Sequence, residues 1–132
     1  MKDGNPELRF VFEQLKAILK PYQDFLVISH EATGEYRLST RFVMSNNQTL
    51  CFADIKLNTG GVSFHLMPVY VDPILLLDIG PELKQQMQSK ANFYFDTLTP
   101  TLNAQLTRLV DLSFRSFQQQ GYVAPMPTQA LL

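Results

Sequence analysis

This 132-residue chain has only one cysteine and no cluster of basic residues. These absences argue against a disulfide-stabilised protein and against a nucleic-acid-binding protein. Cysteine occurs once, at Cys51, so an internal disulfide is excluded and a reducing compartment is favoured. Because Cys51 lies inside a strand-like run, we interpret it as a buried, inert thiol. The chain has 11 Lys and Arg against 12 Asp and Glu, with no basic cluster, which argues against nucleic acid as a partner.

Long apolar runs are missing as well. No run approaches the roughly 18 to 20 residues that cross a bilayer, and residues 1–9 lack the apolar segment of a signal peptide. We therefore expect a cytoplasmic protein without a membrane partner. Apolar residues make up 45% and charged residues 17%, with ten Phe and five Tyr, which predicts an aromatic-rich core and a surface suited to a partner.

Two segments have the apolar spacing of amphipathic helices. In residues 6–20 apolar side chains recur every three or four positions, Pro6 suits the first helical turn, and Pro21 predicts an end near Lys20. Residues 100–120 repeat the pattern and are followed by Gly121, which is typical of the position just after a helix. A helix is therefore expected at each end of the domain.

Between the helices the pattern changes to strands. Residues 49–57 and 62–70 flank Asn58-Thr59-Gly60-Gly61, which indicates a hairpin, although Pro68 predicts that its second strand is bulged, at an edge or ending there. Further strands are expected over 25–30, 36–44 and 91–95, and a turn with short helices over 72–88 is expected to lie over the sheet. The prediction is an α+β fold, an antiparallel sheet of about five strands with both helices packed on it. Residues 1–123 form one domain, and 124–132 form a flexible tail.

In both hairpin strands, apolar residues occupy odd and even positions alike. Both faces of each strand are therefore predicted to be apolar. Helices can cover only one face of such a sheet, so another chain or a ligand should cover the second. We therefore predict a homodimer.

Several stretches resemble the YdhG-like family, a mostly uncharacterised bacterial domain family that contains a frataxin-like iron chaperone. The resemblance covers roughly residues 8–122 and is carried by Phe52-Ala53-Asp54, Val62–Tyr70, Pro81–Lys84 and Ser89–Phe95. It implies an antiparallel sheet with terminal helices. It also implies an alternative function, intracellular iron carriage. However, residues 1–24 hold four acidic and four basic side chains, which leaves no net charge to attract a hard cation.

Three residues could form a small-molecule site. His65 shares a strand face with Ser63 and Met67, and could be a general base, a ligand anchor or a hydrogen-bonded structural group. Together with Tyr70 and Lys90 it could bind a small apolar or anionic ligand. The only other histidine is His30, and no Cys or His neighbours stand at metal-ligand spacing, so we assign no metal site, no cofactor and no catalytic set.

Three functions remain open at this point. A non-catalytic module that binds a small molecule or a protein is favoured, because two-sided apolar strands are present and a catalytic constellation is not. The iron chaperone is the first alternative, and an enzyme of unknown reaction that uses His65 is the second.

Overall fold

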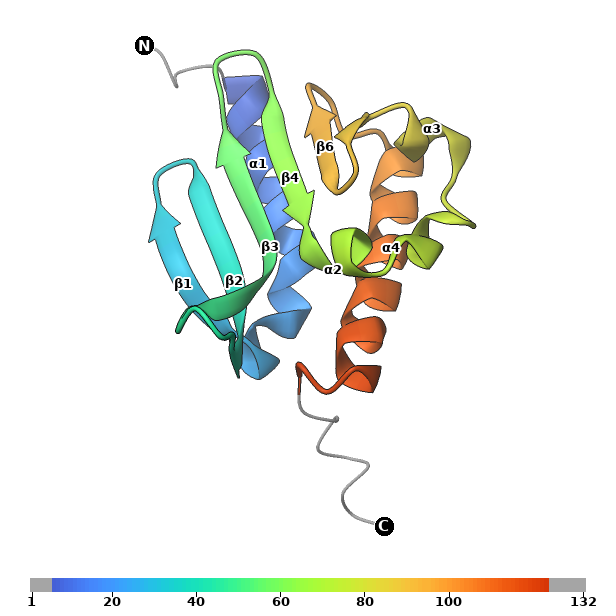
Figure 1. The fold of residues 1–132 in the computed structure, drawn as a ribbon. Helices are drawn as coiled ribbons and strands as arrows, with labels where there is room; N and C mark the ends of the chain where they lie inside the picture. The colour runs from blue at the N-terminus through green and yellow to red at the C-terminus, as the bar shows by residue number, and fades with distance from the viewer. Residues whose placement is uncertain (1–5, 124–132) are drawn as a thin grey trace.

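The computed structural model describes residues 6–123, and within them the chain forms an α+β fold (Figure 1). The sheet is antiparallel and has six strands, in the order β1-β2-β3-β4-β6-β5. The predicted fold class is confirmed, with one strand more than the expected five. The tail predicted for 124–132 lies outside the described residues.

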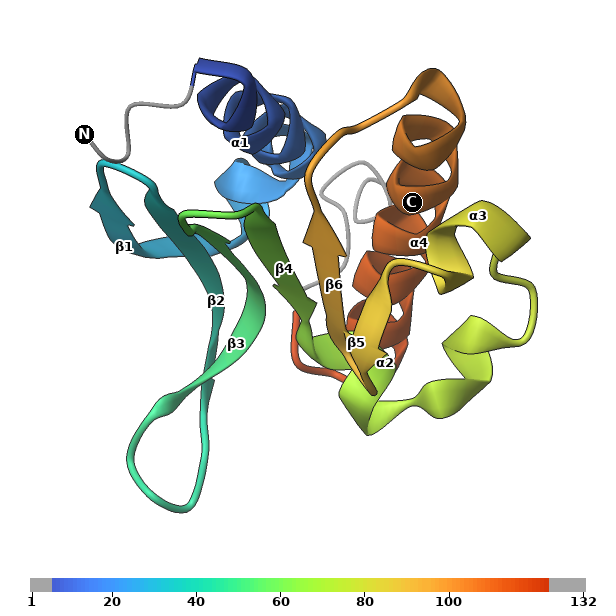
Figure 2. The same ribbon diagram turned by 90° about the horizontal axis from the view of Figure 1, so that it is seen from above.

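The elements follow one another in a helix, strand, helix, strand, helix arrangement. They are α1 (Pro6–Leu19), the 3-10 helix η2 (Lys20–Phe25), β1 (Val27–Ala32), β2 (Glu35–Val43), β3 (Thr49–Leu57), β4 (Val62–Leu66), α2 (Met67–Val71), the 3-10 helix η3 (Pro73–Leu76), α3 (Pro81–Lys84), β5 (Met87–Ser89), β6 (Asn92–Phe95) and α4 (Pro100–Gln119). Both long helices lie on the same side of the sheet (Figure 2). The other face of the sheet carries no helix in the described residues (Figure 1).

Local chemistry explains where the long helices begin and end. Pro21 cannot continue the hydrogen bonding of α1, and the chain continues as η2. At the start of α4, the Thr99 Oγ1 accepts a hydrogen bond from the Leu102 N–H at 3.1 Å, and Pro100 occupies the first turn. After α4, Gly121 has a φ of +87°, which glycine adopts without the strain that a Cβ would add.

A β-bulge in β3 overturns the prediction of a sheet that is apolar on both faces. Leu38 pairs with Ala53 and Ser39 pairs with Cys51, so Phe52 is an extra residue in β3. The bulge shifts the alternation by one position, so that Phe52 and Ala53 are both fully buried. On either side of the bulge, the apolar residues of β3 then face the helices, and its polar residues face the open side of the sheet. The argument for a homodimer from two apolar sheet faces therefore fails.

The strand β5 was missed by sequence analysis. The region 82–88 was expected to be helical, but α3 ends at Lys84, and Met87 pairs with Phe93 of β6. The Gln86 carbonyl accepts a hydrogen bond from the Tyr94 N–H at 2.9 Å. Because β5 has only three residues, it gives no readable alternation, and its pairing depends on the partner strand.

Aromatic side chains join the two long helices to the sheet. Phe52 of β3 is fully buried and lies within 6.2 Å, between ring centroids, of Tyr22, Phe114 and Phe117. These three come from η2 and α4, so a single residue of the sheet contacts both the segment that follows α1 and the C-terminal half of α4. The predicted aromatic core is confirmed.

Two tyrosines of the core, the buried Tyr36 and the partly buried Tyr22, have satisfied hydroxyls rather than catalytic surroundings. The Tyr22 hydroxyl donates to Asp111 Oδ1 at 3.0 Å, and the Tyr36 hydroxyl donates to Gln23. Burial, reinforced by Asp111, raises the pKa of Tyr22 to about 12. Burial, reinforced by Glu31, raises the pKa of Tyr36 to about 12 as well. Both phenols therefore stay neutral at physiological pH.

The turn between β3 and β4 packs tightly on β6, and this contact gives the first prediction. A Cβ added at Gly61 would lie 2.6 Å from the Tyr94 ring, so Gly61→Ala is expected to lower the free energy of unfolding by about 1–3 kcal/mol. Urea unfolding measures the change. The control is Tyr94→Leu, in which the ring is absent. In that background Gly61→Ala should cost much less, and equal costs in the two backgrounds would contradict the contact.

Candidate functional site

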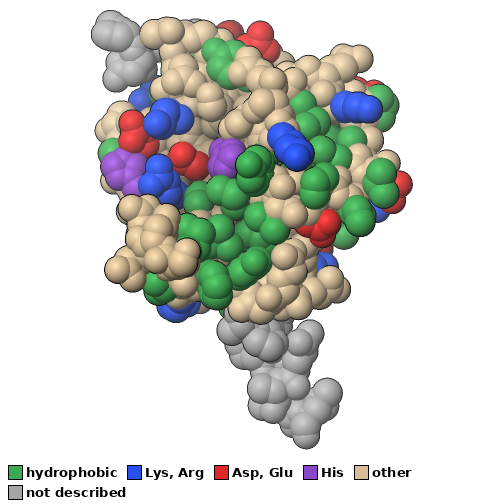
Figure 3. All heavy atoms as spheres, in the orientation of Figure 1, with side chains coloured by type: hydrophobic (Ala, Val, Ile, Leu, Met, Phe, Trp, Pro, Cys, Tyr) green, Lys and Arg blue, Asp and Glu red, His purple; other side chains and the backbone are tan. Residues whose placement is uncertain are grey.

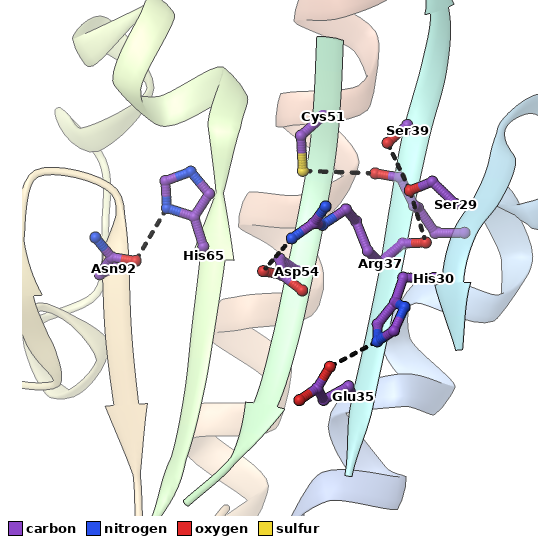
Figure 4. A network of polar contacts seen from close by, with 10 residues as sticks. Ser29, His30, Glu35, Arg37, Ser39, Cys51, Asp54, His65 and Asn92 are labelled. Atoms are coloured by element: carbon purple, nitrogen blue, oxygen red, sulfur yellow. Dashed lines mark hydrogen bonds and ion pairs between the residues drawn. The ribbon is translucent and has the colours of Figure 1, made fainter. Parts of the chain in front are cut away.

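The open face of the sheet carries a row of polar residues that crosses four neighbouring strands. Asp54 of β3 pairs with Arg37 of β2 on one side and with His65 of β4 on the other. His65 in turn pairs with Asn92 of β6. These side chains project from the side of the sheet away from the helices (Figure 4). We call this row, Arg37, Asp54, His65 and Asn92, the polar row.

One end of the polar row is an ion pair. Arg37 Nη2 lies 3.6 Å from Asp54 Oδ2, and beside it His30 Nε2 lies 2.6 Å from Glu35 Oε1 (Figure 4). Asp54 thus forms a cross-strand ion pair with Arg37. Exposed pairs of this kind add little to stability but make the surface hydrophilic.

The other end is a hydrogen-bonded chain. The Asn92 Nδ2 donates to Ser89 Oγ at 2.8 Å, which turns Asn92 Oδ1 toward His65 Nδ1 at 2.9 Å. Because Oδ1 can only accept, Nδ1 of His65 donates the proton in this hydrogen bond. His65 is thus oriented by an amide, not by a carboxylate of the kind that activates a catalytic histidine.

Cys51 lies on the open side of β3 close to this row. Burial, reinforced by the negative charge of Asp54, raises the pKa of the Cys51 thiol to about 12, while Arg37 acts in the opposite direction. The thiol contacts the Leu38 carbonyl at 3.7 Å (Figure 4). A nucleophilic cysteine needs a lowered pKa, so this environment disfavours attack by the sulfur.

Tyr70 and Lys90 do lie together, as the ligand-binding hypothesis requires. The Lys90 ammonium is 5.6 Å from the centre of the Tyr70 ring, which is a cation–π distance. Both side chains are exposed. His65 is hydrogen-bonded to Asn92, two residues after Lys90. Tyr70 and Lys90 stand out from the surface rather than enclosing a ligand.

Pro68 explains how that surface is formed. β4 ends at Leu66, and Pro68 lies in the first turn of α2, so the strand ends as one of the predicted options allowed. Val69 is fully buried, whereas Tyr70 on the next position is 58% exposed. The short helix thus turns one apolar side chain into the core and the next one outward.

The segment after α2 exposes more apolar side chains. Ile74 is 69% exposed and Leu77 is 80% exposed, while Leu75 and Leu76 between them pack against the core. Ile74 and Leu77 are three positions apart, and residues at this spacing lie on the same side of a 3-10 helix. We define the α2–η3 surface as Tyr70, Val71, Ile74 and Leu77.

Hydrophobic side chains gather over α2 and extend over the lower part of the sheet beside it (Figure 3). Basic, acidic and histidine side chains lie over the upper part of β1 to β4 (Figure 3). The α2–η3 segment packs against α4, with Ser116 Oγ donating to Asp72 Oδ2 at 3.2 Å. The expectation that this insert lies over the sheet is therefore wrong, because its inward apolar residues pack mainly along α4.

Sequence analysis named Tyr70 but missed Ile74 and Leu77. The signal that could have found them is the uninterrupted run Ile74-Leu75-Leu76-Leu77 next to Pro73. A run of four apolar residues in a single helical turn points in all directions, so some of its side chains must face outward.

Residues 6–123 contain neither a cluster of metal-ligating side chains nor a helix that could span a membrane. No group of three or more His, Cys, Asp or Glu side chains there is placed to hold a metal ion. In the same residues, each helix is too short or too polar to cross a bilayer.

Comparison with known proteins leaves the chain without a match, whether to a family model, to a curated protein or to a solved structure. The resemblance to the YdhG-like family therefore stays a prediction.

Proposed function

We propose that the protein is a non-catalytic interaction module that binds another polypeptide through the α2–η3 surface, and that a second copy of the chain is one such polypeptide. The observation that carries the proposal is the exposure of four large apolar side chains within eight residues. Contiguous exposed apolar residues of this kind are typical of protein interaction sites.

The chemistry beside this surface supports binding rather than catalysis. The side-chain hydrogen bond of His65 goes to an amide, the Lys90 ammonium lies over the Tyr70 ring, and the pKa of Cys51 is raised. None of these arrangements pairs a nucleophile with a base. In the proposed complex Tyr70 and Lys90 lie at the polar rim of the interface, where a charged side chain over an aromatic ring remains hydrated.

Self-association fits the charge of the surface. The four residues that define it are uncharged, so a two-fold contact centred on them opposes no like charges there, while Asp78 after Leu77 and Lys90 over Tyr70 border it. The homodimer predicted from the sequence is thus proposed again on a different basis, the α2–η3 surface instead of the sheet.

Light scattering after size exclusion directly tests whether the protein self-associates through the α2–η3 surface. The wild type is expected to have twice the monomer mass of 15.1 kDa at high micromolar concentration and to dissociate on dilution. The double variant Ile74→Lys with Leu77→Lys should remain at 15.1 kDa throughout, because an isologous contact would bring four ammonium groups together.

The matched control is Phe10→Lys, which places a lysine at another exposed apolar position, on α1. This variant is expected to keep the wild-type mass. A wild type that stays monomeric at every concentration would refute self-association, and loss of the dimer in Phe10→Lys would place the contact elsewhere.

A further inference from the structure

Arg108 lies on α4 without a partner for its charge. Its side chain is exposed, and among residues 6–123 it forms no ion pair and no side-chain hydrogen bond. The acidic side chain three positions along the helix, Asp111, accepts hydrogen bonds from the Tyr22 hydroxyl at 3.0 Å and from Arg115 Nε at 2.8 Å. The neighbour on the helix that could neutralise Arg108 is therefore already engaged.

A pocket of about 250 Å³ lies beside Arg108, between α4 and the segment from η3 to α3. The chain from α2 to α3 runs alongside α4 in both views of the ribbon (Figure 1, Figure 2). The α4 wall of the pocket consists of side chains at steps of three and four positions, which share one face of the helix. They are Gln105, Arg108, Leu109 and Leu112. The opposite wall is formed by Leu75, Asp78, Ile79 and Gly80.

Gly80 and Gln105 fix the two walls against each other. A Cβ added at Gly80 would lie 2.2 Å from Gln105 Cδ, so the absence of a side chain lets the segment approach α4 this closely. The Gln105 amide is itself held in place, because its Oε1 accepts from the Leu83 N–H at 2.9 Å and its Nε2 donates to Glu82 Oε1 at 2.7 Å. The pocket is therefore preformed, as most small-molecule sites are.

Asp78 supplies a second charge to the pocket. Like Arg108 it is exposed, and within residues 6–123 it forms no ion pair and no side-chain hydrogen bond, so the two charges do not neutralise each other. Apart from the Gln105 amide, the other side chains of the lining are apolar. The pocket thus offers one cation, one anion and an apolar surface to a ligand.

We propose that this pocket, which we name the α4 pocket, binds a free α-amino acid with an apolar side chain. The Arg108 guanidinium pairs with the α-carboxylate, because its planar set of donors matches two carboxylate oxygens. The Asp78 carboxylate accepts hydrogen bonds from the α-ammonium group. The side chain of the amino acid packs against the apolar lining, which includes Leu109 and Leu112.

Size and charge decide among the possible ligands. The volume is below the range of about 300–1,000 Å³ that holds drug-sized molecules, so the ligand is a small metabolite. A dicarboxylate or a phosphate would bring a second negative charge near Asp78, and a diamine would bring a second positive charge near Arg108. A monocarboxylate leaves Asp78 without a partner. A zwitterion with an apolar side chain satisfies both charges and the apolar lining.

The α4 pocket acts independently of the proposed dimer contact. None of the four residues that define the α2–η3 surface lines it. Binding of an amino acid is measured by titration, whereas self-association is measured by the mass of the particle. Failure of either proposal therefore leaves the other intact.

NMR titration of the isotope-labelled full chain tests the proposal. The probes are L-leucine, L-methionine and L-phenylalanine. At least one of them is expected to shift the amide signals of residues 75–80 and 105–112 saturably, with a dissociation constant below about 1 mM. Two analogues of the tightest probe follow, one without the ammonium group and one without the carboxylate. For leucine these are 4-methylpentanoate and 3-methylbutylamine, and each should bind about tenfold or more weakly than the amino acid.

Paired variants locate the two charges. Asp78→Asn should weaken the amino acid about tenfold or more and should not weaken the analogue that lacks the ammonium group. Arg108→Gln should weaken the amino acid similarly and spare the analogue that lacks the carboxylate. A variant that failed to fold would lose both ligands, so the pairing separates a lost contact from a lost fold. The matched controls are Asp96→Asn and Arg41→Gln, exposed positions outside the pocket, which should bind within about twofold of the wild type.

Four outcomes would overturn the proposal. They are the absence of saturable binding by all three amino acids, shifts that fall outside the two walls of the pocket, an analogue that binds as tightly as the amino acid, and an affinity for the amino acid that neither Asp78→Asn nor Arg108→Gln lowers.

Discussion

Phe52→Ala is expected to lower the free energy of unfolding by about 3–5 kcal/mol, the cost of removing a fully buried phenylalanine from a packed core. Phe52 contacts the rings of Tyr22, Phe114 and Phe117, which belong to η2 and to α4. It is also the extra residue of the bulge in β3. The cavity cannot close by a shift of one helix alone, so a value near the upper end is expected.

Chemical denaturation by urea measures this change. The control is Phe42→Ala, because Phe42 is 43% exposed and contacts Tyr122 at the periphery. The control should cost less than half as much, since part of the ring is already in water. Similar costs for the two variants would show that Phe52 does not hold the layers together as described.

Cys51 is expected to react with iodoacetamide about 1,000-fold more slowly at pH 8 than an unperturbed cysteine. Its pKa of about 12, against an ordinary value of 9.0, lowers the fraction of thiolate by about that factor. The sign follows from the cause, because burial and the charge of Asp54 both disfavour the thiolate. Mass spectrometry of the intact protein gives the rate.

Two further alkylation rates are compared with that of Cys51 in the folded wild type. Asp54→Asn removes a charge that raises the pKa, so alkylation of Cys51 should become faster. The unfolded chain in urea supplies the rate of the unperturbed thiol. A folded protein that reacts at the unfolded rate would contradict the buried, inert thiol and would reopen a catalytic role for Cys51.

The helices were predictable because their signals are local. The apolar spacing of 6–20 gave α1, and Pro21 marked its end. The apolar spacing of 100–120 gave α4, and Gly121 marked its end. Proline and positive-φ glycine act through the backbone of their own neighbours, so no knowledge of the tertiary fold is needed to read them.

The faces of the sheet were not predictable in the same way. Strict alternation along β3 puts Asp54 on the side of Phe52, whereas the bulge puts it on the opposite side. The bulge depends on the pairing of Leu38 and Ser39 with β3, which is information carried by another strand. β5 was missed for a similar reason, since its three residues pair only because β6 is present.

The ligand site inferred from the sequence stays a prediction. Of its three residues, Tyr70 and Lys90 lie at a cation–π distance from each other. His65 was correctly placed beside Ser63 on one strand face. Ile74 and Leu77, which make the surface apolar, were missed, because their outward orientation depends on how the segment packs against α4.

Hydrogen–deuterium exchange at low and high protein concentration tests the proposed interface most directly. Peptides that cover residues 67–77 are expected to exchange more slowly at the higher concentration, where the α2–η3 surface is covered by a second copy. Peptides from α1 and β1 supply the internal control and should exchange at the same rate at both concentrations. Concentration-independent exchange of 67–77, or protection that falls on β1 or α1 instead, would contradict the account.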